Sequence, residues 1–343
     1  MIFSRMMRRA ILLAAIIFTA TTSYAGGTYA DVVRTRRANS SIYGLRPTSD
    51  GDHYTILKGR SVVRCSYADR ADSVVLFRSP SDIADYALSA DGQMALFADA
   101  GSVRRIYRHS YTANYALARE GECRTILHDV RDVSFSPDGK RLAYAQHNNL
   151  WLYDIDSQRA TPVTTDGEWN AVINGTSEWV YEEEYGFTRA YAFSPDGGQI
   201  AYLRFDESRV PLFEMMRYDG TLHNKAYTFK YPKAGDPNSV VELWLYDVAS
   251  ATKRKVDVGA ERDQYIFNVA WTPAGELYFY RVNRLQNLFE VVLQRAGEQP
   301  KVIYREESPR YVERPTTSTV TFIDGERFIV REETSTGWMH LYL

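Results

Sequence analysis

Val133-Ser-Phe-Ser-Pro-Asp-Gly139 is followed by Leu142-Ala-Tyr144, and Tyr191-Ala-Phe-Ser-Pro-Asp-Gly197 is followed by Ile200-Ala-Tyr202. In each stretch an alternating apolar and polar run leads into an Asp-Gly turn, and a second apolar run follows the turn. Asp-Gly between two such runs is a strong hairpin signal, because glycine accepts the positive φ that a tight turn requires. Both stretches therefore predict antiparallel β-hairpins.

The same signal recurs along the chain. Its glycines stand at positions 51, 92, 139, 197, 275 and 325, at intervals of 41, 47, 58, 78 and 50 residues. A hairpin that recurs every 40 to 50 residues or so is typical of a β-propeller, in which each repeat forms one four-stranded blade. Leu150-Trp-Leu-Tyr-Asp154 and Leu243-Trp-Leu-Tyr-Asp247 each follow a hairpin where a third strand should lie. The sequence thus predicts an all-β propeller; unrelated hairpins in a sandwich are the alternative.

The two long intervals predict insertions between strands. The 58-residue interval contains the acidic run Glu182–Glu184, which we expect in a connection and not on a ladder strand. The 78-residue interval contains Arg209–Asp236, where Lys230-Tyr-Pro-Lys-Ala-Gly235 resembles an extended arm that leaves its blade. Long connections in a compact body are usually functional.

The acidic run lies within Asn174-Gly-Thr-Ser-Glu-Trp-Val-Tyr-Glu-Glu-Glu-Tyr-Gly-Phe187. No basic residue stands between Glu178 and Arg189, so the acids share this span with aromatic rings alone. Adjacent carboxylates repel each other, and a cation between them relieves the repulsion. The stretch is therefore a candidate receptor for a cationic ligand, with a solvated acidic turn as the alternative.

The first 25 residues predict an export signal. Three arginines precede the apolar run Ala10–Ala20, and Ser23-Tyr-Ala25 supplies a small-x-small cleavage pattern. The apolar run is too short for a comfortable membrane span, although an uncleaved anchor is the alternative. We therefore expect cleavage near Ala25 and a periplasmic or secreted product. The rest of the chain carries 38 basic and 43 acidic residues, a formal charge of −5, so it has no basic footprint for nucleic acid.

Cysteine and histidine are sparse. The two cysteines, Cys65 and Cys123, stand 58 residues apart, and their pairing does not follow from the sequence. Two unpaired buried thiols are at least as compatible with the sequence as a disulfide. No Cys/His cluster has zinc spacing, and the six histidines are scattered. We predict no metal and no other cofactor.

Several segments resemble one known family. Trp179-Val-Tyr-Glu-Glu-Glu184, Tyr107-Arg-His-Ser-Tyr-Thr-Ala113 and Tyr231-Pro-Lys-Ala-Gly235 are together similar to the N-terminal propeller of dipeptidyl peptidase IV, in the prolyl oligopeptidase family of serine peptidases. The resemblance runs from about Ile42 onward, and the leader resembles the bacterial exported type. It implies removal of dipeptides from peptide N-termini, with proline or alanine at the second position.

The resemblance also implies roles for three residues. Glu183 and Glu184 match the paired glutamates that hold the free amine of the substrate, and Arg108 matches the arginine that helps hold the same end. A carboxylate pair suits an ammonium group, and a guanidinium can bind a carbonyl while offsetting the glutamates' repulsion. Anchoring the N-terminus at a fixed distance from the nucleophile selects the bond after the second residue. Glu182 is expected to be structural or solvent-facing. Trp179, Tyr181 and Tyr185 are expected to pack the insertion. The alternative for Arg108 is that it is one of several surface arginines without a role in binding.

The departure from the family is large. Its catalytic Ser, Asp and His lie in a C-terminal α/β-hydrolase domain with a Gly-x-Ser-x-Gly turn, and the sequence contains no such turn. We expect a signal peptide at residues 1–25, a lead-in at 26–45 and a propeller at 46–343. This propeller is expected to be truncated mid-blade at Gly337-Trp-Met-His-Leu-Tyr-Leu343, after about five to six of the family's eight blades. No catalytic residue is assigned, and whether the chain is an enzyme is left uncertain.

Two functions follow from these observations. In the first, the chain is the propeller of an exported exopeptidase, inactive alone, whose partners are peptide N-termini and the α/β-hydrolase domain of the full-length protein. A homodimer contact through the arm near Lys230–Gly235 is also implied by the resemblance. In the second, the chain is a periplasmic binding or scaffolding propeller. The pairing of Glu183 and Glu184 with Arg108 favours the first, because a scaffold has no need of an ammonium receptor.

Overall fold

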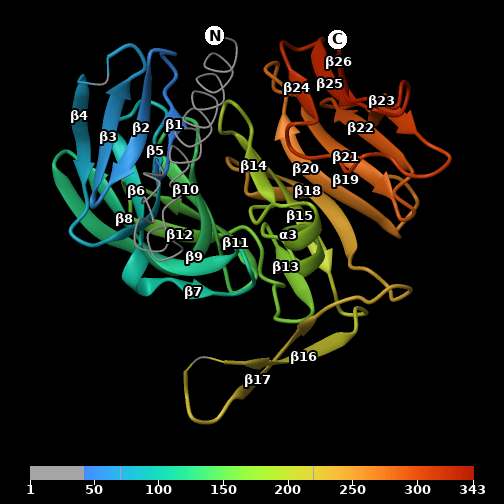
Figure 1. The fold of residues 1–343 in the computed structure, drawn as a ribbon, viewed down its shortest axis with the longest axis horizontal. Coiled ribbons are helices and arrows are strands. Elements are labelled where there is room, and N and C mark those ends of the chain that lie inside the picture. Colours follow the sequence, from blue (N-terminus) through green and yellow to red (C-terminus); the bar gives the residue numbers. More distant parts are fainter. Residues whose placement is uncertain (1–41, 70, 219) are drawn as a thin grey trace, which may run out of the picture.

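The computed structural model describes residues 42–69, 71–218 and 220–343 (Figure 1). The predicted signal peptide, Met1–Ala25, and residues 26–41 of the predicted lead-in lie outside the described residues. Within the described ranges, no helix has the length and the apolar character needed to cross a membrane.

The described residues begin with a four-stranded antiparallel sheet in the order β1-β2-β3-β4. The bounds of these strands are β1 (Arg46–Pro47), β2 (His53–Lys58), β3 (Ser61–Ser66) and β4 (Ser73–Arg78). Consecutive strands pair with their sequence neighbours, so the unit is a meander. This is the strand order of a propeller blade.

The next sheet contains two such units joined through one long strand. The bounds are β5 (Ile83–Leu88), β6 (Met94–Asp99), η1 (Ala100–Ser102), β7 (Arg104–Arg105), β8 (Tyr111–Arg119), β9 (Glu122–Phe135), β10 (Arg141–Gln146), β11 (Asn149–Asp154) and β12 (Arg159–Pro162). The first part of β9 pairs with β8, and its last part pairs with β10. Asp129 and Asp132 lie at the register shifts of these two pairings and have φ of +54° and +56°, and these two kinks let one strand belong to both units.

The remaining sheets follow in chain order. Their bounds are β13 (Val172–Asn174), α3 (Trp179–Glu184), β14 (Tyr191–Phe193), β15 (Gln199–Asp206), β16 (Leu212–Arg217), β17 (Lys225–Lys230), β18 (Val240–Asp247), β19 (Thr252–Val256), β20 (Gln264–Trp271), β21 (Leu277–Asn283), β22 (Leu288–Gln294), β23 (Lys301–Glu307), β24 (Val320–Phe322), β25 (Phe328–Glu332) and β26 (His340–Tyr342). Strands β15, β18 and β19 form a sheet whose inner edge pairs with both β13 and β14. Strands β20 to β23 form a four-stranded sheet, and β24 to β26 form a three-stranded one.

All six predicted hairpins are present. Their strand pairs are β1–β2, β5–β6, β9–β10, β14–β15, β20–β21 and β24–β25. The predicted third strands are also present, as β11 beside β10 and β18 beside β15. Apart from the pair β16–β17, the described residues form five four-stranded units and one three-stranded unit, which confirms the predicted all-β propeller fold with about five to six blades.

The Asp-Gly turns share one local arrangement. In the turn at Gly139, the Ser136 hydroxyl donates to Asp138 Oδ1 at 2.6 Å and accepts from the Arg141 amide at 2.9 Å. Gly139 has a φ of +71°, which a residue with a side chain rarely adopts. The same hydroxyl bonds recur in the turns at Gly92 and Gly197. The turn is therefore fixed by residues within six positions of one another.

The largest core cluster joins the acidic insertion to the two sheets beside it. Tyr181 on α3 is 2% exposed, and its hydroxyl accepts a hydrogen bond from the Ile266 amide of β20 at 3.2 Å. The Tyr181 ring also packs edge-on against Phe205 of β15, at 4.9 Å between ring centroids. Tyr185 packs against Phe267 at 4.2 Å, and Trp179 is partly buried against the same cluster. The expectation that these three aromatic residues pack the insertion is confirmed.

The insertion at Arg209–Asp236 forms a two-stranded arm. Strands β16 and β17 pair in register from Leu212 opposite Lys230 outward, and in Figure 1 they project from the body at the bottom of the view. Lys230 lies at the base and is buried, because its ammonium donates to the carbonyls of Ser208 and Val210 at 3.1 and 2.7 Å. The prediction that Lys230–Gly235 is itself the arm was therefore wrong: this segment anchors the arm to the body.

Cys65 on β3 and Cys123 on β9 are both free thiols. Cys65 is buried and Cys123 is partly buried, and burial raises the pKa of the Cys123 thiol. Of the two alternatives left open by the sequence, unpaired thiols are confirmed.

Candidate functional site

The three consecutive glutamates lie on the short helix α3, between strands β13 and β14. Glu178 caps the helix, because its carboxylate accepts from the amides of Val180 and Tyr181 at 3.1 and 3.2 Å. Gly186 follows with a φ of +72° and turns the chain away from the helix. The expectation that the acids lie in a connection and not on a ladder strand is confirmed.

The helix directs the three carboxylates to different surroundings. Successive helical residues are rotated by about 100°, so neighbouring side chains do not share one face. Glu182 is 1% exposed, whereas the side chains of Glu183 and Glu184 are 17% and 58% exposed. The splayed arrangement weakens the mutual repulsion that the bare sequence suggests. Of the two expectations for Glu182, the structural role agrees with its burial. The expectation that it faces solvent was wrong.

Arg108 belongs to residues 106–110, the connection between β7 and β8. Its Nη1 lies 3.7 Å from Oε2 of Glu183, and its side chain is 75% exposed. The structure therefore places Arg108 beside Glu183, 75 residues further along the chain. The neighbouring arginines are engaged elsewhere: Arg104 pairs with Asp129 at 2.5 Å, and Arg105 donates to the carbonyls of residues 108 and 109.

Glu184 has a different partner from the one expected. Its Oε2 lies 3.4 Å from Nη1 of Arg314, in the connection between β23 and β24. Sequence reasoning assigned no role to this connection and did not single out Arg314. No local pattern marks this arginine, because its partner lies 130 residues earlier in the chain.

A second acidic pair lies beneath the helix, and sequence reasoning missed it. Glu178 and Glu207 are each 1% exposed. Burial raises the pKa of Glu178 to about 7, although the two helix amides that donate to it oppose the rise. Burial and repulsion from Glu178 raise the pKa of Glu207 to about 8, although the nearby Lys230 opposes the rise. Burial, followed by the charge of Glu207, also raises the pKa of Tyr107, which is therefore neutral at physiological pH.

A cavity of about 500 Å³ opens beside the candidate site. It lies between the Arg108 connection and the segment that follows α3, and its lining includes His109, Ser110, Gly186, Phe187 and Arg189. Its lining includes His109, the chain neighbour of Arg108, but none of Glu183, Glu184 and Arg108 themselves. The arrangement is suited to binding, since it combines carboxylates of different exposure with two guanidinium groups.

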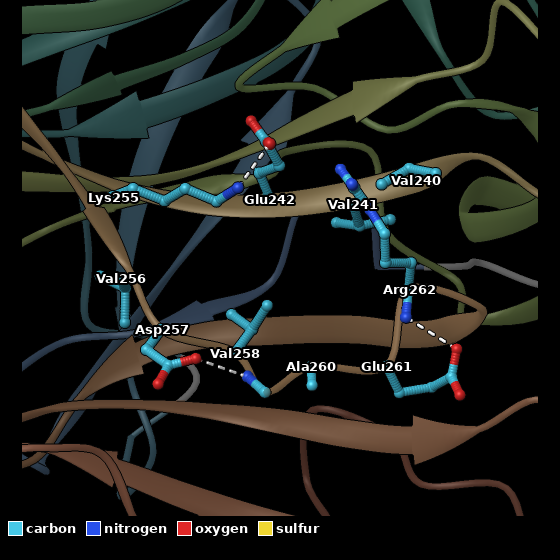
Figure 2. A pocket seen from close by; sticks show the side chains of 11 residues that line it. Val240, Val241, Glu242, Lys255, Val256, Asp257, Val258, Ala260, Glu261 and Arg262 are labelled. Carbon is cyan, nitrogen blue, oxygen red and sulfur yellow. Dashed lines mark hydrogen bonds and ion pairs between the residues drawn. The ribbon is translucent and has the colours of Figure 1, made fainter.

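A second cavity, of about 450 Å³, lies away from these residues, between β18, β19 and the connection that follows β19 (Figure 2). Its charged groups are engaged within the chain. Lys255 donates to Glu242 at 2.6 Å, Asp257 accepts from the Gly259 amide at 2.8 Å, and Glu261 accepts from the Arg262 amide at 2.7 Å (Figure 2). It contains none of the residues predicted to bind a ligand. Among the described residues, no group of three or more His, Cys, Asp or Glu side chains could hold a metal ion.

Known proteins resemble the chain over most of its length. The family model of the dipeptidyl peptidase IV (DPP IV) N-terminal region matches residues 89–343. Dipeptidyl peptidase 4 of Arthroderma otae is 29% identical over 283 residues, which are 77% of this chain and 36% of the relative. Dipeptidyl peptidase 4 of Felis catus is 30% identical over 268 residues, which are 72% of this chain and 35% of the relative. The chain thus spans about a third of the length of these relatives.

Solved structures agree with this assignment. The crystal structure of Porphyromonas gingivalis dipeptidyl peptidase 4 superposes with a TM-score of 0.83 at 34% identity, covering 91% of this chain and 47% of that one. A putative dipeptidyl aminopeptidase IV from Bacteroides ovatus shares the fold, with a TM-score of 0.63 at 20% identity, covering 88% of this chain and 43% of that one. The propeller fold, the matched region and the curated relatives all agree: the chain belongs to the dipeptidyl peptidase IV N-terminal region family.

Proposed function

We propose that the chain is the N-terminal propeller of a dipeptidyl peptidase IV-like serine exopeptidase, and that Glu183, Glu184 and Arg108 hold the free amine end of its peptide substrate. The observation that carries the proposal is the pair formed by Glu183 and Arg108. Its 3.7 Å separation is longer than a hydrogen bond, and the Glu183 side chain is 17% exposed. A partly dry carboxylate that is not tightly paired can still accept charge-assisted hydrogen bonds from an ammonium group.

The proposed reaction is the release of Xaa-Pro or Xaa-Ala dipeptides from peptide N-termini. The nucleophile would come from an α/β-hydrolase domain of the full-length protein, since the 343 residues contain no Gly-x-Ser-x-Gly turn. The matched relatives are nearly three times as long as the segment that this chain matches. The propeller would fix one end of the peptide, so that only the bond after the second residue reaches the nucleophile. The 343-residue chain is expected to bind such peptides and to hydrolyse none.

Export and dimerisation form part of the same proposal. The leader Met1–Ala25 supports a periplasmic or secreted protein, with cleavage near Ala25.

The arm supports a homodimer contact, because β16 presents Leu212, Met215 and Met216 at 60%, 51% and 54% exposure. We place that contact on the projecting strands and not on Lys230–Gly235, which lies where β17 ends at the base of the arm and includes the buried Lys230. Light scattering of the arm variant Met215→Lys against the unaltered protein tests it.

The experiment for the amine site uses the protein expressed from its complete reading frame. Binding of Gly-Pro-amide is measured by calorimetry, with N-acetyl-Gly-Pro-amide as the ligand that lacks the positive charge. Glu183→Gln and Arg108→Ala are the test variants, and Glu298→Gln, an exposed acid in the turn between β22 and β23, is the matched control. We expect only the free amine to bind, and we expect both test variants to weaken it by about tenfold or more.

The outcomes separate the proposal from a scaffold role. Equal affinity for the acetylated ligand, or unchanged affinity in both test variants, would refute the amine receptor. If the reading frame continues into a Gly-x-Ser-x-Gly domain, Glu183→Ala should lower kcat/KM for Gly-Pro-amide by a factor of roughly 10² or more, mainly through KM. Cleavage by the 343-residue chain itself would show that its catalytic machinery had been missed.

A further inference from the structure

The segment that carries Arg108 has a firmly bonded backbone beneath an exposed side chain. The Ile106 amide donates to the Ser110 carbonyl at 3.0 Å, and the Tyr107 amide donates to the Ser110 hydroxyl at 3.2 Å. From outside the turn, Arg105 donates to the carbonyls of Arg108 and of the following residue at 3.2 and 3.1 Å. The place of this turn is therefore set by its backbone.

Two hydrogen bonds attach this turn to helix α3. Oε1 of Glu182 accepts from the amides of His109 and Ser110 at 2.6 and 2.8 Å. These residues directly follow Arg108, and they lie 73 and 72 positions before Glu182 in the sequence. The glutamate next to Glu183 thus holds the backbone next to Arg108. Both members of the candidate amine site are one residue away from this contact.

The ion pair between Arg108 and Glu183 cannot set this geometry by itself. At 3.7 Å, with an arginine side chain that is 75% exposed, it resembles the surface ion pairs that contribute little to stability. A buried carboxylate that accepts two amide hydrogen bonds is a stronger constraint, because its bonds are charge-assisted and shielded from water. The separation between Arg108 and Glu183 is therefore controlled from Glu182.

Glu182 is also costly to bury. It is 1% exposed, and within the described part of the chain its Oε2 has no hydrogen-bond partner. A buried acceptor without a partner destabilises the fold, so packing alone does not favour a carboxylate at this position. Its two amide bonds to the turn are the contacts that account for it.

We infer that Glu182 is a positioning residue for amine recognition, which holds Arg108 at its place beside Glu183 without touching the ligand. This inference rests on the proposed function, and it assigns to the first glutamate a role separate from that of the other two. Glutamate at this position ties two segments from different sheets into one receptor. Without the tie, the turn and the helix can move apart, and the guanidinium loses its fixed distance from the carboxylate.

The test compares Glu182→Ala and Glu182→Gln with Arg108→Ala in the protein from the complete reading frame, using Gly-Pro-amide as the probe. We expect Glu182→Ala to weaken binding about tenfold, and by no more than Arg108→Ala does. Glu182→Gln keeps an acceptor oxygen and the side-chain volume, so it should restore part of the affinity. Glu182→Gln also provides the test if Glu182→Ala fails to fold. Hydrogen exchange of the amides of His109 and Ser110 should be faster in Glu182→Ala than in the unaltered protein.

A double-mutant cycle separates positioning from general damage. If Glu182 acts through Arg108, adding a Glu182 substitution to Arg108→Ala changes the affinity little further. An equal loss in both backgrounds, or unchanged exchange at His109 and Ser110, overturns the inference while the proposed function stands. Unchanged binding in Arg108→Ala and Glu183→Gln removes the proposed function and this inference together. Glu290→Gln, a buried acid of β22, controls for the loss of a buried carboxylate elsewhere.

Discussion

The buried pair Glu178 and Glu207 predicts that the folded protein loses stability as the pH rises. Burial raises the pKa of Glu178 to about 7 and that of Glu207 to about 8, from an ordinary value of 4.5. Between pH 4.5 and 8 the folded state therefore holds protons that the unfolded chain has released. The resulting stabilisation is fully present below pH 4.5, and it disappears as the pH rises through the folded-state values.

The magnitude follows from the same values. One pKa unit corresponds to ~1.4 kcal/mol, so charging Glu178 in place costs the folded state about 3 kcal/mol and charging Glu207 costs on the order of 5 kcal/mol. The two costs overlap, because part of the Glu207 value is repulsion from Glu178. We therefore expect the free energy of unfolding to fall by roughly 3 to 5 kcal/mol between pH 5 and pH 9.

The assay is urea unfolding followed by tryptophan fluorescence at pH 5, 7 and 9. Glu207→Gln carries no charge to bury, so the free energy of unfolding of this variant should decline less as the pH rises. At pH 9 this free energy should exceed that of the unaltered protein by on the order of 3 kcal/mol. Glu298→Gln, an exposed control, should follow the unaltered protein at every pH. Parallel profiles for Glu207→Gln and the unaltered protein across this range would refute the reasoning.

Three further outcomes are expected from the packing. Gly167→Ala should destabilise the fold by on the order of 3 kcal/mol, because the added Cβ would lie 2.3 Å from the carbonyl oxygen of Asn148. A melting temperature within about a degree of that of the unaltered protein would contradict this. Leu203→Ala, at a side chain 1% exposed in the largest core cluster, should cost about 2 to 5 kcal/mol in urea unfolding, and a loss below about 1 kcal/mol would contradict this. Mass spectrometry after alkylation in denaturant without reductant should find Cys65 and Cys123 both modified, and a disulfide-linked peptide pair would refute the assignment of free thiols.

The hairpins show how much of the fold the sequence could predict. Three of the six turns are each fixed by a serine, an aspartate and a glycine within a few positions, as at Ser136, Asp138 and Gly139. The alternating residues on either side then fix the register of the pair. The arm was harder to predict, because its base and its projecting strands have similar compositions. The burial of Lys230 depends on carbonyls from the other strand end, and these become neighbours only when β16 and β17 pair.

The sequence by itself determined the repeated hairpins, the acidic run as an insertion between strands, and Glu183, Glu184 and Arg108 as candidates. These features are carried by residues that are close in sequence or by motifs that stay contiguous. Only the tertiary structure decided the separate surroundings of the three glutamates, the pairing of Glu184 with Arg314 and the buried acids below the helix. The physical reason is distance along the chain: the partners of the three glutamates lie 72 to 130 residues away, and Glu207 meets Glu178 only through tertiary packing. A contact of that kind leaves no periodic or local trace in the sequence.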